Sequence, residues 1–183
     1  CNNREYNEIT KDPSVKKVLH FIGNYVKGKD LINLGASAHN FFVKNIRNVG
    51  ALQVSDYKVY AINNDYHIEN LMKLLKKNFP KLTFKTYNRQ LFWKEHYDTE
   101  AIISLKTKNK KFNNLITFIE NEECVPYVKY NNVKYATVDI LRYRYYMAKE
   151  LPRVFKQTEQ NPLDYECLLK DLIHAEKIHN KKN

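Results

Sequence analysis

The chain has 183 residues, 43% of them hydrophobic and 28% charged, which is enough for one globular domain and excludes a disordered chain. Lys and Arg number 31 against 20 Asp and Glu, and the resulting net charge of +11 favours nucleic acid or an anionic surface as partner. Only 4 Gly and 5 Pro occur, which excludes low-complexity linkers and argues against a Gly-rich phosphate loop of the Walker kind.

In the first half of the chain, apolar residues recur at helical spacing in three places, and β-branched or aromatic residues gather between them. An Asp-Pro-Ser sequence at Asp12 opens the first helix, and Pro80 stops the third. The predicted helices cover residues 14–26, a stretch that starts at Ser37, and residues 66–78. The predicted strands cover residues 31–34, 54–62 and 82–87.

The second half of the chain predicts two hairpins and then two helices. One hairpin has a basic tip, the other has Asn131-Asn132 between Tyr-rich arms, and Pro152 separates the helices. These segments cover residues 100–107 with 112–119, 125–136, 138–150 and 163–179. The fold class is therefore α+β, a mixed sheet with flanking helices and a helical C-terminal end. We expect an N-terminal helical segment (1–30), a sheet domain (31–136) and C-terminal helices packed on it (137–183).

The three cysteines, Cys1, Cys124 and Cys167, lie far apart and make neither a zinc pattern nor a disulfide framework. We therefore expect reduced thiols and a cytoplasmic location. Apolar runs are well short of the ~20 residues that cross a membrane, so no membrane partner is expected. Because the chain begins with Cys rather than Met, we expect a fragment or a processed form.

Gly35-Ala36-Ser37 is a small-residue turn between an apolar run and a predicted helix. Backbone N–H groups at a helix N-terminus point outward and the helix dipole favours an anion there. The turn could therefore hold a triphosphate, with the Ser37 hydroxyl as an extra donor. The alternative is an ordinary strand–turn–helix junction in which Ser37 is the N-cap.

Asp56 and Lys58 lie two residues apart on the next predicted strand. Two carboxylates at this spacing would point to one face and could share divalent metals, but here the second position is a lysine. An ammonium cannot ligate a metal and repels a nearby cation, although it can form a salt bridge with Asp56. The alternative is a surface ion pair on an edge strand, which contributes little to stability.

Several segments together resemble a known family. Leu34 to His39 is similar to a Gly-Gly/Ser helix start, Val54 to Tyr60 to a Ser-Asp-x-Asp-x-Tyr strand, and His96-Tyr97-Asp98-Thr99 to a His-x-x-Thr segment. The stretches that continue the pattern begin at Val125-Pro126, Asn132, Asp139, Tyr145, Leu151 and Asp164. In this order they resemble the poly(A) polymerase catalytic subunits of poxviruses, asfarviruses and giant viruses, from Leu31 to the C-terminus.

The resemblance implies a nucleotidyltransferase fold, adenylate addition to mRNA 3′ ends, and ATP with Mg or Mn as cofactors of an active copy. It implies that Asp56 is the first metal acid and that Lys58 replaces the second. The third acid falls on Leu115, or on Asn114 if the register slips by one. One carboxylate cannot hold two divalent ions, so we expect a catalytically impaired copy with at most a weak metal site at Asp56.

Three functions stay open at this point. The first is an impaired module that binds RNA beside an active polymerase subunit or a second copy of itself, in the host cytoplasm or the virion if the source is viral. Its expected RNA-binding residues are Lys106, Lys108, Lys110, Lys111, Arg142 and Arg144. The second is an active adenylyltransferase whose missing acid is Asp98 or Glu100. The third is a structural protein that keeps only the fold.

Overall fold

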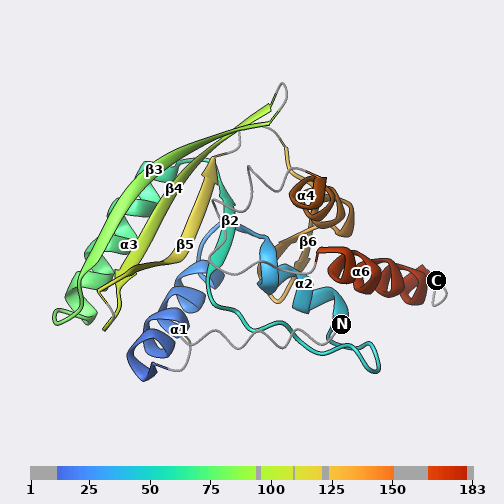
Figure 1. Ribbon diagram of the computed structural model, residues 1–183, viewed down its shortest axis with the longest axis horizontal. Helices are drawn as coiled ribbons and strands as arrows, with labels where there is room; N and C mark the ends of the chain where they lie inside the picture. The colour runs from blue at the N-terminus through green and yellow to red at the C-terminus, as the bar shows by residue number, and fades with distance from the viewer. Residues whose placement is uncertain (1–11, 94–95, 109, 121–123, 151–164, 181–183) are drawn as a thin grey trace.

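The computed structural model describes residues 12–93, 96–108, 110–120, 124–150 and 165–180, without the side chains of 91–93, 96–98 and 179–180 (Figure 1). In chain order its helices are α1 (Pro13–Lys27), α2 (Gly35–Val43), α3 (Asn64–Asn78), α4 (Val138–Glu150) and α6 (Tyr165–Asn180). Its strands are β1 (Ile32–Asn33), β2 (Tyr57–Ala61), β3 (Phe84–Trp93), β4 (His96–Lys106), β5 (Phe112–Glu120), β6 (Tyr127–Tyr130) and β7 (Val133–Ala136).

The strands form one seven-stranded sheet in the order β3-β4-β5-β2-β1-β7-β6. Strand β2 runs parallel to β5 and β1 runs parallel to β7, whereas the other neighbours are antiparallel. The sheet is therefore mixed, and the predicted α+β fold class is confirmed. Because β1 and β2 are neighbours in the middle of the sheet, the segment that enters α2 lies beside β2, and Asp56 lies just before that strand rather than on it as predicted.

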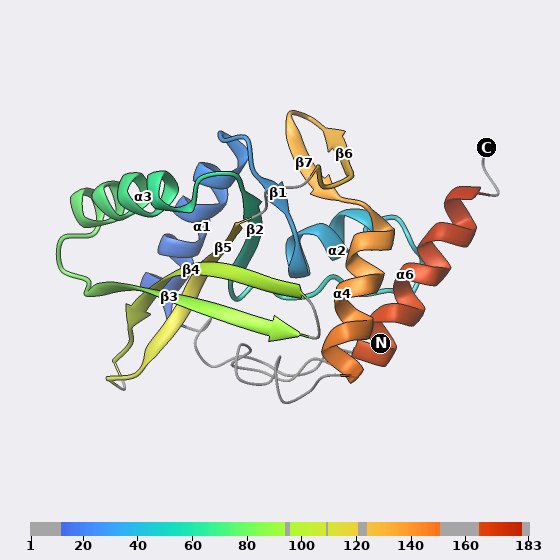
Figure 2. The same ribbon diagram turned by 90° about the horizontal axis from the view of Figure 1, so that it is seen from above.

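Two buried clusters hold the helices against the sheet. One joins α1 and α3 to side chains of β2, β4 and β5, among them Val59 and Phe118. The other joins α2, α4 and α6 to residues such as Leu34, Ile119 and Ala136. Figure 2 shows α1 and α3 on one side of the molecule and α2, α4 and α6 gathered on the other. The sheet separates two apolar layers, and the motifs at Gly35 and Lys58 lie on the α2 side.

The predicted helices agree closely with the structure: α1 extends the predicted span by one residue at each end, and α4 matches its span. The Asn-Asn turn forms a β-hairpin, with φ angles of 47° at Asn131 and 61° at Asn132, as a two-residue hairpin turn of the mirror-image type requires. Strand β3 is longer than predicted because pairing with β4 continues to Trp93.

The cysteines depart from expectation. Cys167 is disulfide-bonded, while Cys124 is exposed and free. Spacing along the chain could not reveal this pairing, because a disulfide needs only proximity in space. None of the described helices combines the length and apolarity that a membrane crossing requires.

Candidate functional site

The Gly35 turn lies directly against β2. The N–H of Leu34 donates to the Lys58 carbonyl at 2.8 Å, which fixes the start of α2 beside the strand. Gly35 has φ +58°, a left-handed conformation that glycine adopts without strain. A Cβ on Gly35 would lie 3.8 Å from Cβ and Cδ of Lys58, so the turn sits over the aliphatic stem of that lysine. The two motifs thus form one site.

Helix α2 begins two residues earlier than predicted, and Ser37 is not its N-cap. Leu34 takes that position and makes no side-chain cap hydrogen bond. The Ser37 hydroxyl instead donates to Asn33 Oδ1 at 3.3 Å, and the Asn33 amide donates to the Lys134 carbonyl at 3.1 Å. Ser37 therefore helps tie α2 to β1 and β7, while the first N–H groups of α2 have no side-chain cap from Leu34.

Asp56 lies in the bend just before β2, and Lys58 is the second residue of the strand. Both side chains are half-buried. Tyr57, Val59 and Ala61 point into the core beneath α1 and α3, so Lys58 points to the opposite face, where α2 lies. The lysine occupies the place where the resemblance puts a second metal acid.

The neighbours of Lys58 across the sheet are uncharged. Residues that are Cα partners on adjacent strands point to the same face of the sheet. Going from β2 across β5 and β4 to β3, the partners that share the Lys58 face are Thr117, Ile102 and Tyr87. None of these partners can supply a carboxylate.

A bulge decides which of the two predicted positions for the third acid faces this site. The pairing between β4 and β5 shifts between Ile103 and Ser104, and Leu115 is the extra residue. Leu115 is 1% exposed and lies in the core beneath α1 and α3. Asn114 lies on the Lys58 face, where its Oδ1 accepts from the Tyr87 hydroxyl at 2.7 Å and from Ser104 Oγ at 3.2 Å. Asn114, not Leu115, is the residue presented to the site.

The acid proposed as a relocated ligand, Glu100, is already engaged. It is buried, and its Oε2 accepts from Arg89 Nε at 3.0 Å. Glu100 pairs with Ile119 and Ile119 with Tyr60, so Glu100 lies two strands across the sheet and four residues along it from Asp56, more than about 13 Å away. The backbone of Asp98 lies further in the same direction. This register does not favour the relocated-acid alternative.

The donor set at Asp56 does not fit a pair of Mg or Mn ions. Such ions need several oxygen ligands, preferably carboxylates. The Lys58 face presents a lysine, a threonine and an amide whose oxygen already accepts two hydrogen bonds, and Asp56 in the preceding bend is the one carboxylate next to it in the chain. Among the described residues, no group of three or more His, Cys, Asp or Glu side chains could hold a metal ion.

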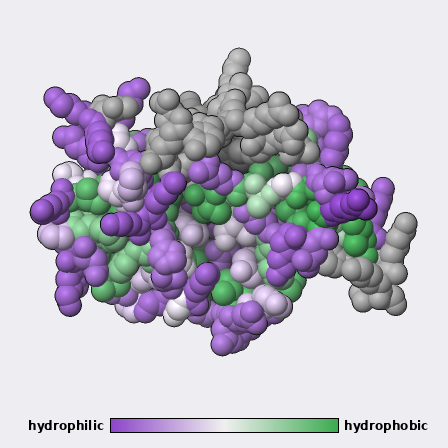
Figure 3. All heavy atoms as spheres, turned by 90° about the horizontal axis from the view of Figure 1, so that it is seen from below, coloured by the Kyte–Doolittle hydropathy of each residue, from purple (hydrophilic) through white to green (hydrophobic). Residues whose placement is uncertain are grey.

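The lysines expected to bind RNA are exposed at the turn between β4 and β5. They are Lys106, Lys108, Lys110 and Lys111. Lys108 is 84% exposed, and its Nζ lies 3.7 Å from Asp12 at the start of α1. Figure 3 shows hydrophilic and hydrophobic side chains interspersed over the face that it draws.

The two arginines expected to bind RNA make contacts within the chain. Arg142 donates to Glu176 at 3.0 Å, which joins α4 to α6. Arg144 donates to the Tyr60 hydroxyl at 3.0 Å, and its guanidinium lies 5.6 Å from the ring centroid. These contacts give both side chains a structural role in holding α4.

His39 is a packing residue in this structure. It is 0% exposed, and burial lowers its pKa from 6.5 to about 4. Its Nδ1 lies 3.3 Å from the Tyr145 hydroxyl, and its Nε2 has no hydrogen-bond partner among the described residues. The neutral ring therefore joins α2 to α4.

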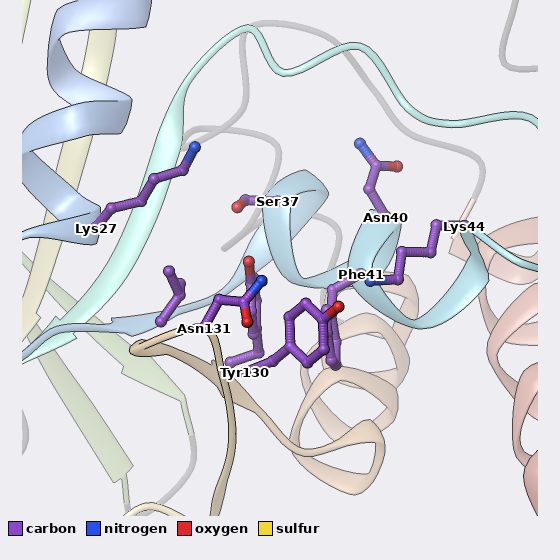
Figure 4. A pocket seen from close by; sticks show the side chains of 9 residues that line it. Lys27, Ser37, Asn40, Phe41, Lys44, Tyr130 and Asn131 are labelled. Carbon is purple, nitrogen blue, oxygen red and sulfur yellow. The ribbon is translucent and has the colours of Figure 1, made fainter.

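Sequence reasoning missed a pocket between α2, the β6–β7 hairpin and the end of α1 (Figure 4). This α2–hairpin pocket has a volume of about 460 Å³, and none of the described residues that line it is acidic. Its walls include Lys27, Phe41, Lys44, Tyr130 and Tyr135. The segments lie far apart in the chain, so the only sequence signal was the Tyr-rich hairpin around Asn131-Asn132.

Comparison with known proteins supports the fold. No protein-family model and no curated sequence matches the chain. Among solved structures, it is similar to the crystal structure of the Megavirus polyadenylate synthase, with a TM-score of 0.71 and 16% identity. The match covers 94% of this chain and 36% of the Megavirus chain, so this chain spans little more than a third of that protein's length. At this identity the likeness shows a poly(A) polymerase-like fold and nothing finer.

Proposed function

We propose that this chain is a nucleotidyltransferase-like module of a viral-type poly(A) polymerase that takes part in adenylate addition to mRNA 3′ ends as a catalytically impaired, RNA-binding unit. The observation that carries the proposal is the position of Lys58. Its stem lies under the Gly35 turn, where a triphosphate and its metals would be held.

The charge of Lys58 explains the impairment. Two-metal phosphoryl transfer needs carboxylates that bridge the ions, and here an ammonium and the amide of Asn114 take their places. A positive charge at close range raises the free energy of a bound divalent cation. The N-terminus of α2 still favours an anion, so we propose weak nucleotide binding at Gly35, Ala36 and Ser37 without efficient catalysis.

RNA binding is supported by the net charge of +11 and by the exposed lysines at the β4–β5 turn. The Megavirus chain is much longer than this one, which supports a place within a longer polymerase, or beside an active subunit or second copy. We place this assembly in the host cytoplasm or the virion.

Primer extension tests the catalytic half of the proposal. The protein is incubated with ATP, Mg²⁺ or Mn²⁺ and a labelled RNA primer, beside an Asp56→Ala variant. We expect no extension from either protein. Robust extension that Asp56→Ala abolishes would overturn the proposed impairment, and loss with Asp98→Ala would support the relocated-acid alternative.

The salt dependence of affinity tests the proposed RNA binding. With four lysine contacts, affinity for oligo(U) should fall about 50-fold between 50 and 200 mM salt. Neutralising Lys108, Lys110 and Lys111 to Gln should weaken binding and flatten this dependence. The matched control neutralises Lys73, Lys76 and Lys77, three exposed lysines of α3. No binding at low salt would leave the third candidate, a structural protein.

A further inference from the structure

The α2–hairpin pocket offers exposed aromatic surface of a kind that nucleobases stack on. Phe41 and Tyr135 line it and stack on each other, with ring centroids 4.2 Å apart and planes 5° from parallel. Tyr130 lies at the edge with its ring centroid 5.7 Å from that of Phe41, and it remains 50% exposed. A flat ligand could therefore lie against Tyr130 without displacing the packed pair.

Two lysines bring positive charge to the same pocket. Lys44 Nζ lies 4.4 Å from the Tyr130 ring centroid and 4.8 Å from that of Phe41. Lys27 extends toward the pocket from the last turn of α1, as Figure 4 shows. Because no described lining residue is acidic, the pocket combines stacking surface with unopposed cationic lining.

The pocket is held in shape before any ligand arrives. The hairpin is tied to the start of β1, because the Asn33 amide donates to the Lys134 carbonyl at 3.1 Å and the Lys134 ammonium pairs with Asp30. The Asn40 amide is held by Leu52, donating to its carbonyl at 2.8 Å and accepting from its N–H at 2.7 Å. A preformed site loses less entropy on binding.

We propose that the α2–hairpin pocket binds a nucleotide of a single-stranded RNA. The base stacks on Tyr130 beside Phe41, and neighbouring phosphates contact Lys44 and Lys27. The volume of about 460 Å³ lies within the usual ~300–1,000 Å³ of ligand pockets. This inference rests on the RNA-binding part of the proposed function and places a second contact away from the β4–β5 turn.

The test uses fluorescence anisotropy of a labelled 12-nucleotide oligo(U) at low salt. Tyr130→Ala should weaken binding about tenfold, the effect of losing one base stack. Its matched control is Tyr127→Ala, because Tyr127 is 45% exposed on the same strand but points to the opposite face of the hairpin. Thermal melts of both variants check that the hairpin still folds.

The contribution of the Lys44 charge to RNA binding is tested with the same anisotropy measurement. Lys44→Gln should weaken binding and lower the salt slope by about 0.7, the value for one phosphate contact to a single strand. Lys85→Gln is the control, since Lys85 also lies over aromatic rings, with Nζ 4.1 Å from the Phe112 centroid, but outside the pocket. Binding of a duplex RNA of equal length should not respond to Tyr130→Ala.

The outcomes separate this inference from the proposed function. If the wild-type protein binds oligo(U) and the two tyrosine variants bind equally well, the pocket assignment is overturned while RNA binding stands. If the wild-type protein binds no RNA at low salt, the RNA half of the proposed function fails and the pocket assignment fails with it. A selective loss in Tyr130→Ala supports both.

Discussion

Lys58 and Gly35 are best understood together. Gly35 adopts a φ of +58° that brings the backbone of α2 against β2, and Lys58 fills the space beneath it with its methylene stem. The turn proposed to hold a phosphate therefore lies against the aliphatic stem of a lysine. Long charged side chains often bury their stem in this way while the charged end reaches a polar edge.

The buried imidazole of His39 predicts how stability depends on pH. Its pKa is about 4 in the folded chain against 6.5 ordinarily, so between these values the unfolded chain takes up a proton that the folded chain does not. Stability should therefore be full above pH 6.5 and fall as the pH drops, by about 2 kcal/mol between pH 7.5 and pH 5.

Urea unfolding at these two pH values measures the effect. His67, whose pKa is also lowered by burial and by Lys29, contributes with the same sign, so the comparison is between wild type and His39→Gln. The variant should lose most of the difference assigned to His39. An unchanged pH dependence in His39→Gln would show that the imidazole is not buried as described.

At the scale of elements, much of the fold follows from periodicity. Helical spacing located α1, α3 and α4, and the Asn131-Asn132 turn located the β6–β7 hairpin. The bulge in β5 was not predictable, because nothing in the local sequence marks Leu115 as an extra residue rather than the next alternating one. The α2–hairpin pocket was missed because residues from three distant segments line it.

The bulge in β5 predicts that a carboxylate at Leu115 and one at Asn114 have very different effects on stability. Leu115→Asp places a carboxylate in the core beneath α1 and α3 and should destabilise the fold by more than about 4 kcal/mol. Asn114→Asp keeps its two hydroxyl donors, Tyr87 and Ser104, and should cost less than about 1 kcal/mol. Chemical denaturation followed by circular dichroism compares them, and similar losses in both variants would contradict the assigned register.

At the scale of the whole molecule, the two faces of the sheet differ in what they carry. The α1 and α3 layer is a conventional apolar core, whereas the α2 face carries both the contact between Gly35 and Lys58 and the α2–hairpin pocket. The architecture can therefore be kept whichever residues stand at positions 56, 58 and 114, because the α1 and α3 core does not depend on them.

The central claim is that Lys58 and Asn114 stand where metal-binding acids would be, and Mn²⁺ binding measured by electron paramagnetic resonance tests it most directly. In the absence of ATP, the wild-type protein should bind no Mn²⁺ at millimolar concentration. The Lys58→Asp, Asn114→Asp double variant should gain a Mn²⁺ site that a further Asp56→Ala change removes. Mn²⁺ bound by the wild-type protein and lost on Asp56→Ala would contradict the account.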